Sequence, residues 1–501
     1  MKHLFFFMLC CLAGIAGAEN FRDIEARVVP VPQKIEVVSR AATPLKEGMT
    51  FQIVSPLKAE EAAALVTDDA KQYWHITPKV ICEKGGEKVS GEGYLLDTTK
   101  PEIVIAASSL SGVRNALRTM RQLAEPERGV ATGCGFVIPQ VKIDDFPQMK
   151  FRAFHFMLAN RQPLWKAERA LRLAAYYKYN YFVLEFVGNI QFDRHPEYAY
   201  DGAYSKSEVK KLVALGKTLG ITLIPQFQIF GHAGCGGING GKHVLLDKHP
   251  EYAPLFEPSG WTWCLANPAA RQYIEDCALE LYELFDCPPY FHVGGDEAYN
   301  AGSCSLCRAD GKYWQKVADH FNCFQKLFAK RNCRILMWHD MLVRRDAPAW
   351  KGSTANGDEN CDKLRAALDR DIIICYWEYR FADHHYRAPK DGVPGFPIFD
   401  FFRKEGFDVV NSGWMHDTTP ALGGKAFKNG GLGILQTTWG QFTNSGNYYM
   451  MLAAGSTSGW NPTAEYKQVI DQKIFTVDLL NKCVRDINYD MKITDDRTST
   501  L

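Results

Sequence analysis

The chain has 501 residues, which is too long for one ordinary hydrophobic core and long enough for a large barrel domain with a smaller companion. Its 58 Lys and Arg are balanced by 57 Asp and Glu, so it has no basic excess with which to bind nucleic acid or an anionic membrane surface. A neutral partner fits this composition better, and aromatic residues at 13% suit either sugar-stacking surfaces or large cores.

Residues 1–18 have the features of a cleaved export signal. Lys2 is followed by an apolar run from Leu4 to about Ala13 and then by small residues that end at Ala18. The run is shorter than the roughly 20 residues that a membrane span needs, and no other segment approaches that length. The sequence therefore predicts an exported protein, periplasmic or secreted, with no integral membrane segment.

Residues 19–147 are expected to form a small α+β accessory domain. They mix short β-rich runs with one amphipathic stretch, SGVRNALRTMRQLAE, in which Val113, Leu117, Met120 and Leu123 recur at helical spacing. A proline-punctuated segment before residue 150 closes this domain.

Residues 148–485 change to a regular alternation of strands and helices. Strand-length apolar runs begin at residues 152, 180, 221, 290, 334, 371, 408 and 433, and helix-like segments separate most of them. Ser205 with Glu208 forms a capping box, and Asn267 before Pro268 marks another helix start. Eight such units predict a (β/α)8 TIM barrel, an α/β fold, followed by a C-terminal tail of residues 486–501.

Barrels of this kind place their chemistry at the C-terminal ends of the strands. The polar and aromatic side chains at those positions are Gln226, Gln228, His232, Asp296, Glu297, Trp338, His339, Asp340, Trp377, Glu378, Trp414, Asp417, Trp439 and Gln441. Four tryptophans at equivalent strand ends indicate a shared aromatic pocket.

The adjacent carboxylates of Asp296 and Glu297 follow the apolar run YFHV and two glycines. A charge at the end of a buried strand costs several kcal/mol unless it is paired or used, and Gly294 and Gly295 would let a backbone or a sugar approach. Consecutive strand side chains point apart, so the pair is not expected to face each other as acid and nucleophile about 5 Å apart. Instead, Glu297 would protonate the leaving oxygen, while Asp296 orients a 2-acetamido group of the substrate that attacks the anomeric carbon.

These residues resemble glycoside hydrolase family 20, the β-N-acetylhexosaminidases. HVGGDE at 292–297 is similar to the family signature His-x-Gly-Gly-Asp-Glu, and PQFQIFGHA at 225–233 is similar to its strand-three motif. The resemblance covers roughly residues 27–460. It implies a glycan or oligosaccharide substrate, Asp296 as the acetamido-orienting residue, Glu297 as the acid/base, His232 as their support, and no cofactor or metal. The residues expected to bind substrate are His232, His292, Asn160, Arg161, Trp338, Trp377, Trp414, Asp417, Trp439 and Gln441.

The chain departs from the family pattern where the sugar would be held. Asn160 stands where an arginine is usual, with Arg161 one residue later, and Gln441 stands in a Trp-x-Glu position. Gln226 and Gln228 replace acidic residues, and Met415 lies near the position of a tyrosine. These changes predict a shifted sugar or linkage preference, and the loss of a carboxylate at Gln441 favours an anionic, for instance sulfated, hexosamine.

Two other functions are considered. A glycan-binding barrel without hydrolysis explains the departures but not the intact HVGGDE. A metal-dependent hydrolase would use His155, His292, Asp296 and His339, whose spacing lacks a tight His-x-His pair.

The cysteines raise a separate question. Two of the 15 lie in the leader, which leaves an odd number in the exported protein. Cys304 and Cys307 form a single Cys-x-x-Cys, so a short disulfide or inert thiols are favoured over half of a zinc site.

Overall fold

The computed structural model describes residues 21–89, 91–127, 135–159, 162–236, 240–350, 354–379, 397–414, 419–439 and 446–464. The chain divides into two compact units. The first contains Lys34–Ser90 and Tyr94–Asp144, and the second contains Ala26–Gln33, Gly91–Gly93 and the chain from Asp145. The predicted leader and tail lie outside the described residues.

The first unit is a mixed β-sheet packed with two helices. Its strand order is β1-β7-β4-β5-β2-β3, with β6 beside β7. The strands are β1 (Lys34–Leu45), β2 (Thr50–Val54), β3 (Lys79–Glu83), β4 (Tyr94–Asp97), β5 (Ile103–Ala106), β6 (Glu125–Pro126) and β7 (Phe136–Asp145), and the helices are α2 (Ala59–Trp74) and α3 (Leu110–Leu123). Helix α3 is the predicted amphipathic helix: Val113, Leu117, Met120 and Leu123 are all fully buried.

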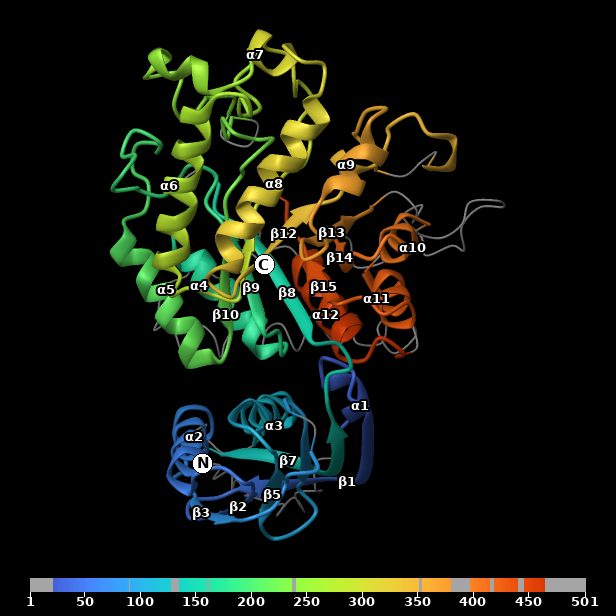
Figure 1. Ribbon diagram of the computed structural model, residues 1–501. Helices are drawn as coiled ribbons and strands as arrows, with labels where there is room; N and C mark the ends of the chain where they lie inside the picture. The colour runs from blue at the N-terminus through green and yellow to red at the C-terminus, as the bar shows by residue number, and fades with distance from the viewer. Residues whose placement is uncertain are drawn as a thin grey trace, which may run out of the picture. The chain divides into compact units, whose positions relative to one another are not determined.

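The second unit is a closed barrel of parallel strands (Figure 1). Its strands are β8 (Phe151–Met157), β9 (Tyr181–Glu185), β10 (Thr222–Gln226), β11 (Tyr290–His292), β12 (Arg334–Trp338), β13 (Ile373–Trp377), β14 (Asp408–Gly413) and β15 (Gly433–Gln436). Strand β15 pairs with β8, which closes the ring. The predicted (β/α)8 barrel with an α+β companion is confirmed.

Helices cover the outside of the barrel strands (Figure 1). The helices of this unit are α4 (Trp165–Tyr176), α5 (Lys206–Leu219), α6 (Pro268–Leu284), α7 (Ser305–Arg308), α8 (Tyr313–Ala329), α9 (Cys361–Ala367), α10 (Pro397–Lys404), α11 (Thr419–Lys428) and α12 (Gly446–Trp460). The loops add the 3-10 turns η1 (Pro250–Leu255), η2 (Asp340–Leu342) and η3 (Pro348–Trp350), and the short helix α1 (Ile24–Arg27) precedes β1. The expected capping box of Ser205 and Glu208 begins α5, and Asn267 caps α6 through Ala269 N. Both helix starts could be predicted from the sequence because a cap involves only neighbouring residues.

Side chains fill the inside of the barrel below its C-terminal mouth. The buried set is Phe151, Ala153, Val183, Ile224, Leu336, Trp338, Ile373, Cys375, Val410 and Leu435. The barrel is therefore a packed core rather than a pore, and open space is left to the strand ends. Among the described residues, no helix is both long enough and apolar enough to cross a membrane.

Candidate active site

A cavity of about 390 Å³ lies among residues that end or follow the barrel strands. It is lined by Glu185, Val187, Gln228, His232, Cys235, Trp261, Asp296, Glu297, Trp377, Tyr379, Trp414 and Trp439. Aromatic rings and a few polar groups that converge on one cavity are typical of a site for a small organic ligand. The volume and lining suit a sugar ring.

Asp296 and Glu297 both face His232 across this cavity. The His232 Nε2 atom lies 3.4 Å from Asp296 Oδ2 and 3.4 Å from Glu297 Oε2. The expectation that the two carboxylates point apart is wrong, because strand β11 ends at His292 and Glu297 has a φ of 49°. This left-handed conformation is costly for a glutamate and is found mostly where the surrounding structure imposes it, often at functional sites.

His232 is held as a cation between the two carboxylates. Burial alone would lower the pKa of this imidazole, but the charge of Asp296 and the hydrogen bonds with Asp296 and Glu297 outweigh it and raise the pKa to about 10. The ring also packs on Trp261, with ring centroids 4.4 Å apart. His232 is therefore charged at neutral pH and fixes the positions of both carboxylates.

Asp340 holds the backbone of Glu297 in place, next to the two carboxylates. Its Oδ2 accepts hydrogen bonds from the Glu297 N–H at 3.0 Å and from Asn356 Nδ2 at 2.8 Å, and its Oδ1 accepts from Trp377 Nε1 at 3.3 Å. Burial, followed by the neighbouring charge of Asp296, raises the pKa of Asp340 to about 7. Asp340 thus anchors the Glu297 backbone without adding a full third charge at neutral pH.

The two glycines before the acid pair make room for protein side chains. A Cβ at Gly294 would lie 1.8 Å from Gln228 Oε1, and one at Gly295 would lie 2.9 Å from Phe321. We expected the space to admit a backbone or a sugar, and Gln228 and Phe321 occupy it instead. Gln228 accepts from the Gly295 N–H at 3.3 Å and donates to Glu185 Oε1 at 2.8 Å, so it ties strand β9 to the acid loop.

An aromatic wall closes the opposite side of the cavity. Trp439 Nε1 donates to the Tyr379 hydroxyl at 2.6 Å, and the Tyr379 ring contacts those of Trp377 and Trp414, with both centroid distances at 5.4 Å. Three of the four predicted tryptophans, Trp377, Trp414 and Trp439, therefore line one pocket.

Comparisons with known proteins agree with this geometry. Residues 140–445 match the family model described as glycosyl hydrolase family 20, catalytic domain, and residues 25–146 match that of glycosyl hydrolase family 20, domain 2. The chain belongs to glycosyl hydrolase family 20.

Its relatives within family 20 are distant. A β-hexosaminidase of Porphyromonas gingivalis is 23% identical over 447 residues, covering 75% of this chain and 54% of that protein. A β-hexosaminidase of Vibrio furnissii is 25% identical over 343 residues, covering 60% and 54%. The chain thus spans about half the length of these curated relatives. The crystal structure of an exo-β-N-acetylglucosaminidase of Vibrio harveyi in complex with N-acetylglucosamine has a TM-score of 0.68 at 17% identity, covering 93% of this chain and 78% of that one.

Two residues that were expected to bind substrate, Trp338 and His292, lie beneath the cavity instead. Trp338 is fully buried, with its ring centroid 4.3 Å from His292 and 5.3 Å from Trp439. His292 is also fully buried, and its Nδ1 accepts from the Gly294 N–H at 3.1 Å. The strand register sets His292 level with Leu336 and Trp338 level with Cys375, and both of these partners are core residues, so His292 and Trp338 support the pocket floor rather than line it.

Several other predicted positions cannot be placed. Asn160, Arg161, Met415, Asp417 and Gln441 lie outside the described residues. Conversely, sequence reasoning missed Glu185, Val187, Cys235, Trp261 and Tyr379 as lining residues. Glu185 ends strand β9 and Tyr379 stands two residues after β13, so strand-end position was a usable signal for both. Trp261 lies far along the loop after β10, and nothing local marks it.

The histidines considered for a metal-dependent hydrolase do not converge. His339 Nε2 lies 3.0 Å from the Thr354 carbonyl, its Nδ1 accepts from the Trp377 N–H, and burial lowers its pKa to about 3. His155 Nε2 lies 3.4 Å from Glu185 Oε2. Within the described part of the chain, His155, His292 and His339 share no cluster with ligand geometry. We interpret these three residues as structural histidines of the barrel.

Proposed function

We propose that this protein removes terminal β-linked N-acetylhexosamine, GlcNAc or GalNAc, from glycans by substrate-assisted, retaining hydrolysis. One observation carries the proposal. Asp296 Oδ1 is buried at the cavity and has no hydrogen-bond partner among the described residues, while Asp296 Oδ2 is engaged with His232. A buried acceptor without a partner is costly, and an acetamido N–H of a bound sugar would satisfy it.

The adjacent Glu297 supplies the proton in this mechanism. Its carboxyl group protonates the glycosidic oxygen while the acetamido carbonyl oxygen attacks the anomeric carbon, which breaks the glycosidic bond and forms a cyclic oxazolinium. Asp296 accepts the hydrogen bond of the acetamido N–H and stabilises the positive charge that develops there. Water then attacks the same carbon, Glu297 takes its proton, and the configuration is retained.

Tyr379 is suited to hold the acetamido oxygen. Its hydroxyl accepts from Trp439 Nε1 and lies 3.2 Å from Thr437 Oγ1. Thr437 Oγ1 donates its own proton to the Gly413 carbonyl at 2.9 Å, so it can only accept from Tyr379. The phenol proton is therefore directed to Thr437 Oγ1 at 3.2 Å, and it would turn from this contact to the acetamido oxygen of a bound sugar. Burial raises the pKa of Tyr379, which keeps the phenol protonated. Tyr379 would take the role of the tyrosine expected near Met415.

The first experiment measures release of p-nitrophenol from the β-linked N-acetylglucosaminide and N-acetylgalactosaminide. Glu297→Gln and Asp296→Asn should each lower kcat/KM by about 100-fold or more, since the first loses the proton that is transferred and the second loses the charge that stabilises the acetamido group. The exposed Glu251→Gln is the matched control and should behave as wild type. The plain β-glucoside, which has no acetamido group, should not be cleaved.

The competing function is a barrel that binds glycans without cleaving them. It is favoured if the folded wild-type protein releases nothing from either acetamido sugar. Binding to a glycan array, unaffected by Glu297→Gln, would then be expected. A requirement for both the acetamido group and Glu297 contradicts it.

We also propose an altered sugar preference. Gln228 is committed to Glu185 and Gly295, and Gln226 is buried, so neither offers the carboxylate that the family pattern would place on strand three. Glu185 lines the cavity instead. Turnover of 6-sulfated and plain aryl N-acetylglucosaminides tests whether an anionic sugar is preferred. Equal or lower activity on the sulfated compound rules the preference out.

Finally, we propose that the protein is exported. The support is the leader-like pattern of residues 1–18, with Lys2, an apolar run and small residues before Ala18. The intact mass of the protein recovered from its native cells tests this. A mature chain that begins near Glu19, found outside the cytoplasm, is expected, and a cytoplasmic full-length chain contradicts the proposal.

A further inference from the structure

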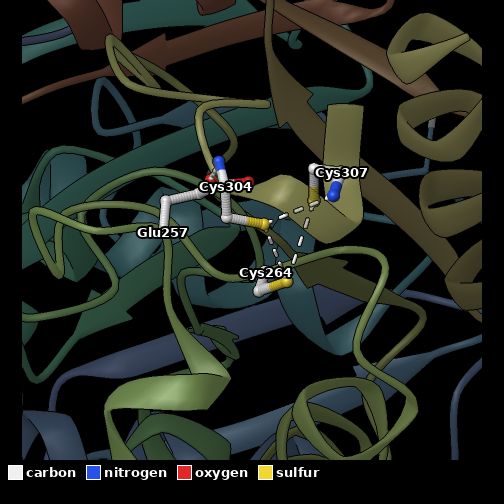
Figure 2. A group of neighbouring side chains, drawn as sticks. All are labelled: Glu257, Cys264, Cys304 and Cys307. Carbon is white, nitrogen blue, oxygen red and sulfur yellow. Dashed lines mark hydrogen bonds between the residues drawn. The ribbon is translucent and has the colours of Figure 1, made fainter. Parts of the chain in front are cut away.

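Three cysteines and one glutamate converge on a point away from the residues that line the active-site cavity (Figure 2). Cys264 lies in the loop between β10 and α6, Cys304 and Cys307 lie at the start of α7, and Glu257 follows η1. The Cys264 Sγ is 3.6 Å from Cys304 Sγ and 3.7 Å from Cys307 Sγ. One ligand atom from each of the four residues lies within 4.8 Å of all the others.

These separations match the edges of a metal coordination tetrahedron. An ion with Zn–S bonds of about 2.3 Å in tetrahedral geometry holds its sulfurs about 3.8 Å apart. Thiolate-rich sets select soft or borderline ions, and Zn²⁺ is the usual ion for four closed ligands of this kind. We propose that Cys264, Cys304, Cys307 and Glu257 bind one structural Zn²⁺ ion.

The Glu257 carboxylate is the observation that argues most strongly for a cation. The residue is 1% exposed, and no Lys or Arg forms a salt bridge with it anywhere in the described residues. Its Oε1 accepts from the Gly302 N–H at 3.2 Å, and its Oε2 accepts from Ser303 Oγ at 3.1 Å and the Cys304 N–H at 2.6 Å. A buried carboxylate needs a compensating charge, and a metal ion supplies it.

A backbone N–H group also donates a hydrogen bond to one of the sulfurs, as is common for metal thiolates. The Cys307 N–H donates to Cys304 Sγ at 3.3 Å. Hydrogen bonds from the chain to the ligand atoms orient them before the metal binds. The sequence did not predict this site, because the Cys-x-x-Cys pair has no second pair to complete it. The other two ligands are a single cysteine, 40 residues before Cys304, and a glutamate.

The sequence favoured a short disulfide or inert thiols, and inert thiols leave the buried Glu257 carboxylate without a compensating charge. A disulfide would join two of the three sulfurs and leave the third thiol and the buried carboxylate unexplained. Cys264 lies almost equally far from Cys304 and Cys307, which selects no pair, and none of the described cysteines is disulfide-bonded. These nearly equal distances fit one ion bound by all three sulfurs better than a disulfide between two of them.

The ion would clamp two loops that carry active-site residues. The loop with Glu257 and Cys264 also carries Trp261, whose Nε1 donates to the Glu297 carbonyl at 2.6 Å. The loop with Cys304 and Cys307 also carries Glu297, and it is tied back by Asn300, whose Oδ1 accepts from Thr262 Oγ1 at 2.7 Å. With four protein ligands the ion has no open position for water, so its role is structural, and the inference does not depend on the proposed hydrolysis.

Metal content tests the proposal directly. The full-length protein, produced with added zinc and purified without a histidine tag, is analysed by inductively coupled plasma mass spectrometry. About one zinc per chain is expected in the wild type, and much less in Cys264→Ser, Cys304→Ser and Glu257→Gln. Cys323→Ser, which alters a half-buried thiol on α8 outside the cluster, should keep its zinc.

A second measurement uses only the wild-type protein, so its result does not depend on whether the variants fold. A mercurial thiol reagent added to the wild type should release zinc to a chromogenic chelator, and stripped protein should unfold at a temperature several degrees lower. Wild-type protein with almost no zinc, or peptide mapping that finds a disulfide between two of the three cysteines, overturns the proposal. Zinc that stays in all three cluster variants overturns the assignment of these ligands.

Discussion

The cation between the two active-site carboxylates leads to a specific prediction for His232→Gln. The His232 pKa rises from 6.5 to about 10, and a shift of about 3.5 units corresponds to about 5 kcal/mol at 1.36 kcal/mol per unit. The side chain is 19% exposed, so solvent screening reduces this value. We expect the variant to lose about 2–3 kcal/mol of unfolding free energy at pH 6.

The pH dependence of that loss is the sharper part of the prediction. A histidine whose pKa is raised by folding contributes stability that is complete below its ordinary pKa of about 6.5 and disappears as the pH rises through about 10. Urea unfolding of wild type and His232→Gln, followed by tryptophan fluorescence at pH 6, 8 and 10.5, measures it. Trp74 is the single tryptophan before the barrel, so the signal reports mainly on the barrel.

The difference between the two proteins should therefore shrink toward zero at the highest pH. His249→Gln is the control, because His249 is more exposed and its contact, with Glu251 at 3.2 Å, lies on the surface. It should change stability little at any pH. A difference for His232→Gln that is the same at pH 6 and 10.5, or that is absent at pH 6, would show that His232 is not held as a cation by Asp296 and Glu297.

Three further predictions concern the walls of the site. Tyr379→Phe should lower kcat/KM on the N-acetylglucosaminide by about tenfold or more through loss of one hydrogen bond, and unchanged kinetics would remove this residue from acetamido binding. Because folding raises the Asp340 pKa from 3.8 to about 7, wild-type stability should fall as the pH rises between those values, and urea unfolding of Asp340→Asn should give a flatter profile. Gly294→Ala, whose Cβ would meet Gln228 Oε1, should cost about 2 kcal/mol or more in thermal unfolding, whereas Gly240→Ala, also at positive φ but with open space, should cost less.

Secondary structure and barrel order were readable from the chain because the signals are local. Each barrel strand is a short apolar run, since parallel strands are buried on both faces, and the caps at Ser205 and Asn267 involve residues only two or three positions away. The position of the chemistry also followed, because parallel strands bring all their C-terminal ends to one mouth. Asp296, Glu297, His232 and the three lining tryptophans were found in this way.

Side-chain direction could not be read from the same pattern. Sequence spacing placed Trp338 beside Trp377 in the pocket, but the strand register sets Trp338 level with Cys375, two residues before Trp377, and so in the core. The rule that successive strand residues alternate failed for Asp296 and Glu297, because the strand ends earlier and Glu297 adopts a positive φ. The first error comes from the register between neighbouring strands, and the second comes from a strand that ends early.

The sequence by itself therefore determined the fold, the family and the acid pair, since periodicity, caps and a contiguous motif are properties of neighbouring residues. Only the tertiary structure decided which groups meet across long separations. It brought His232 to both carboxylates, Tyr379 to Trp439, and Cys264 to Cys304 and Cys307. These contacts depend on where loops from different strands pack above the barrel, and no local pattern carries that information.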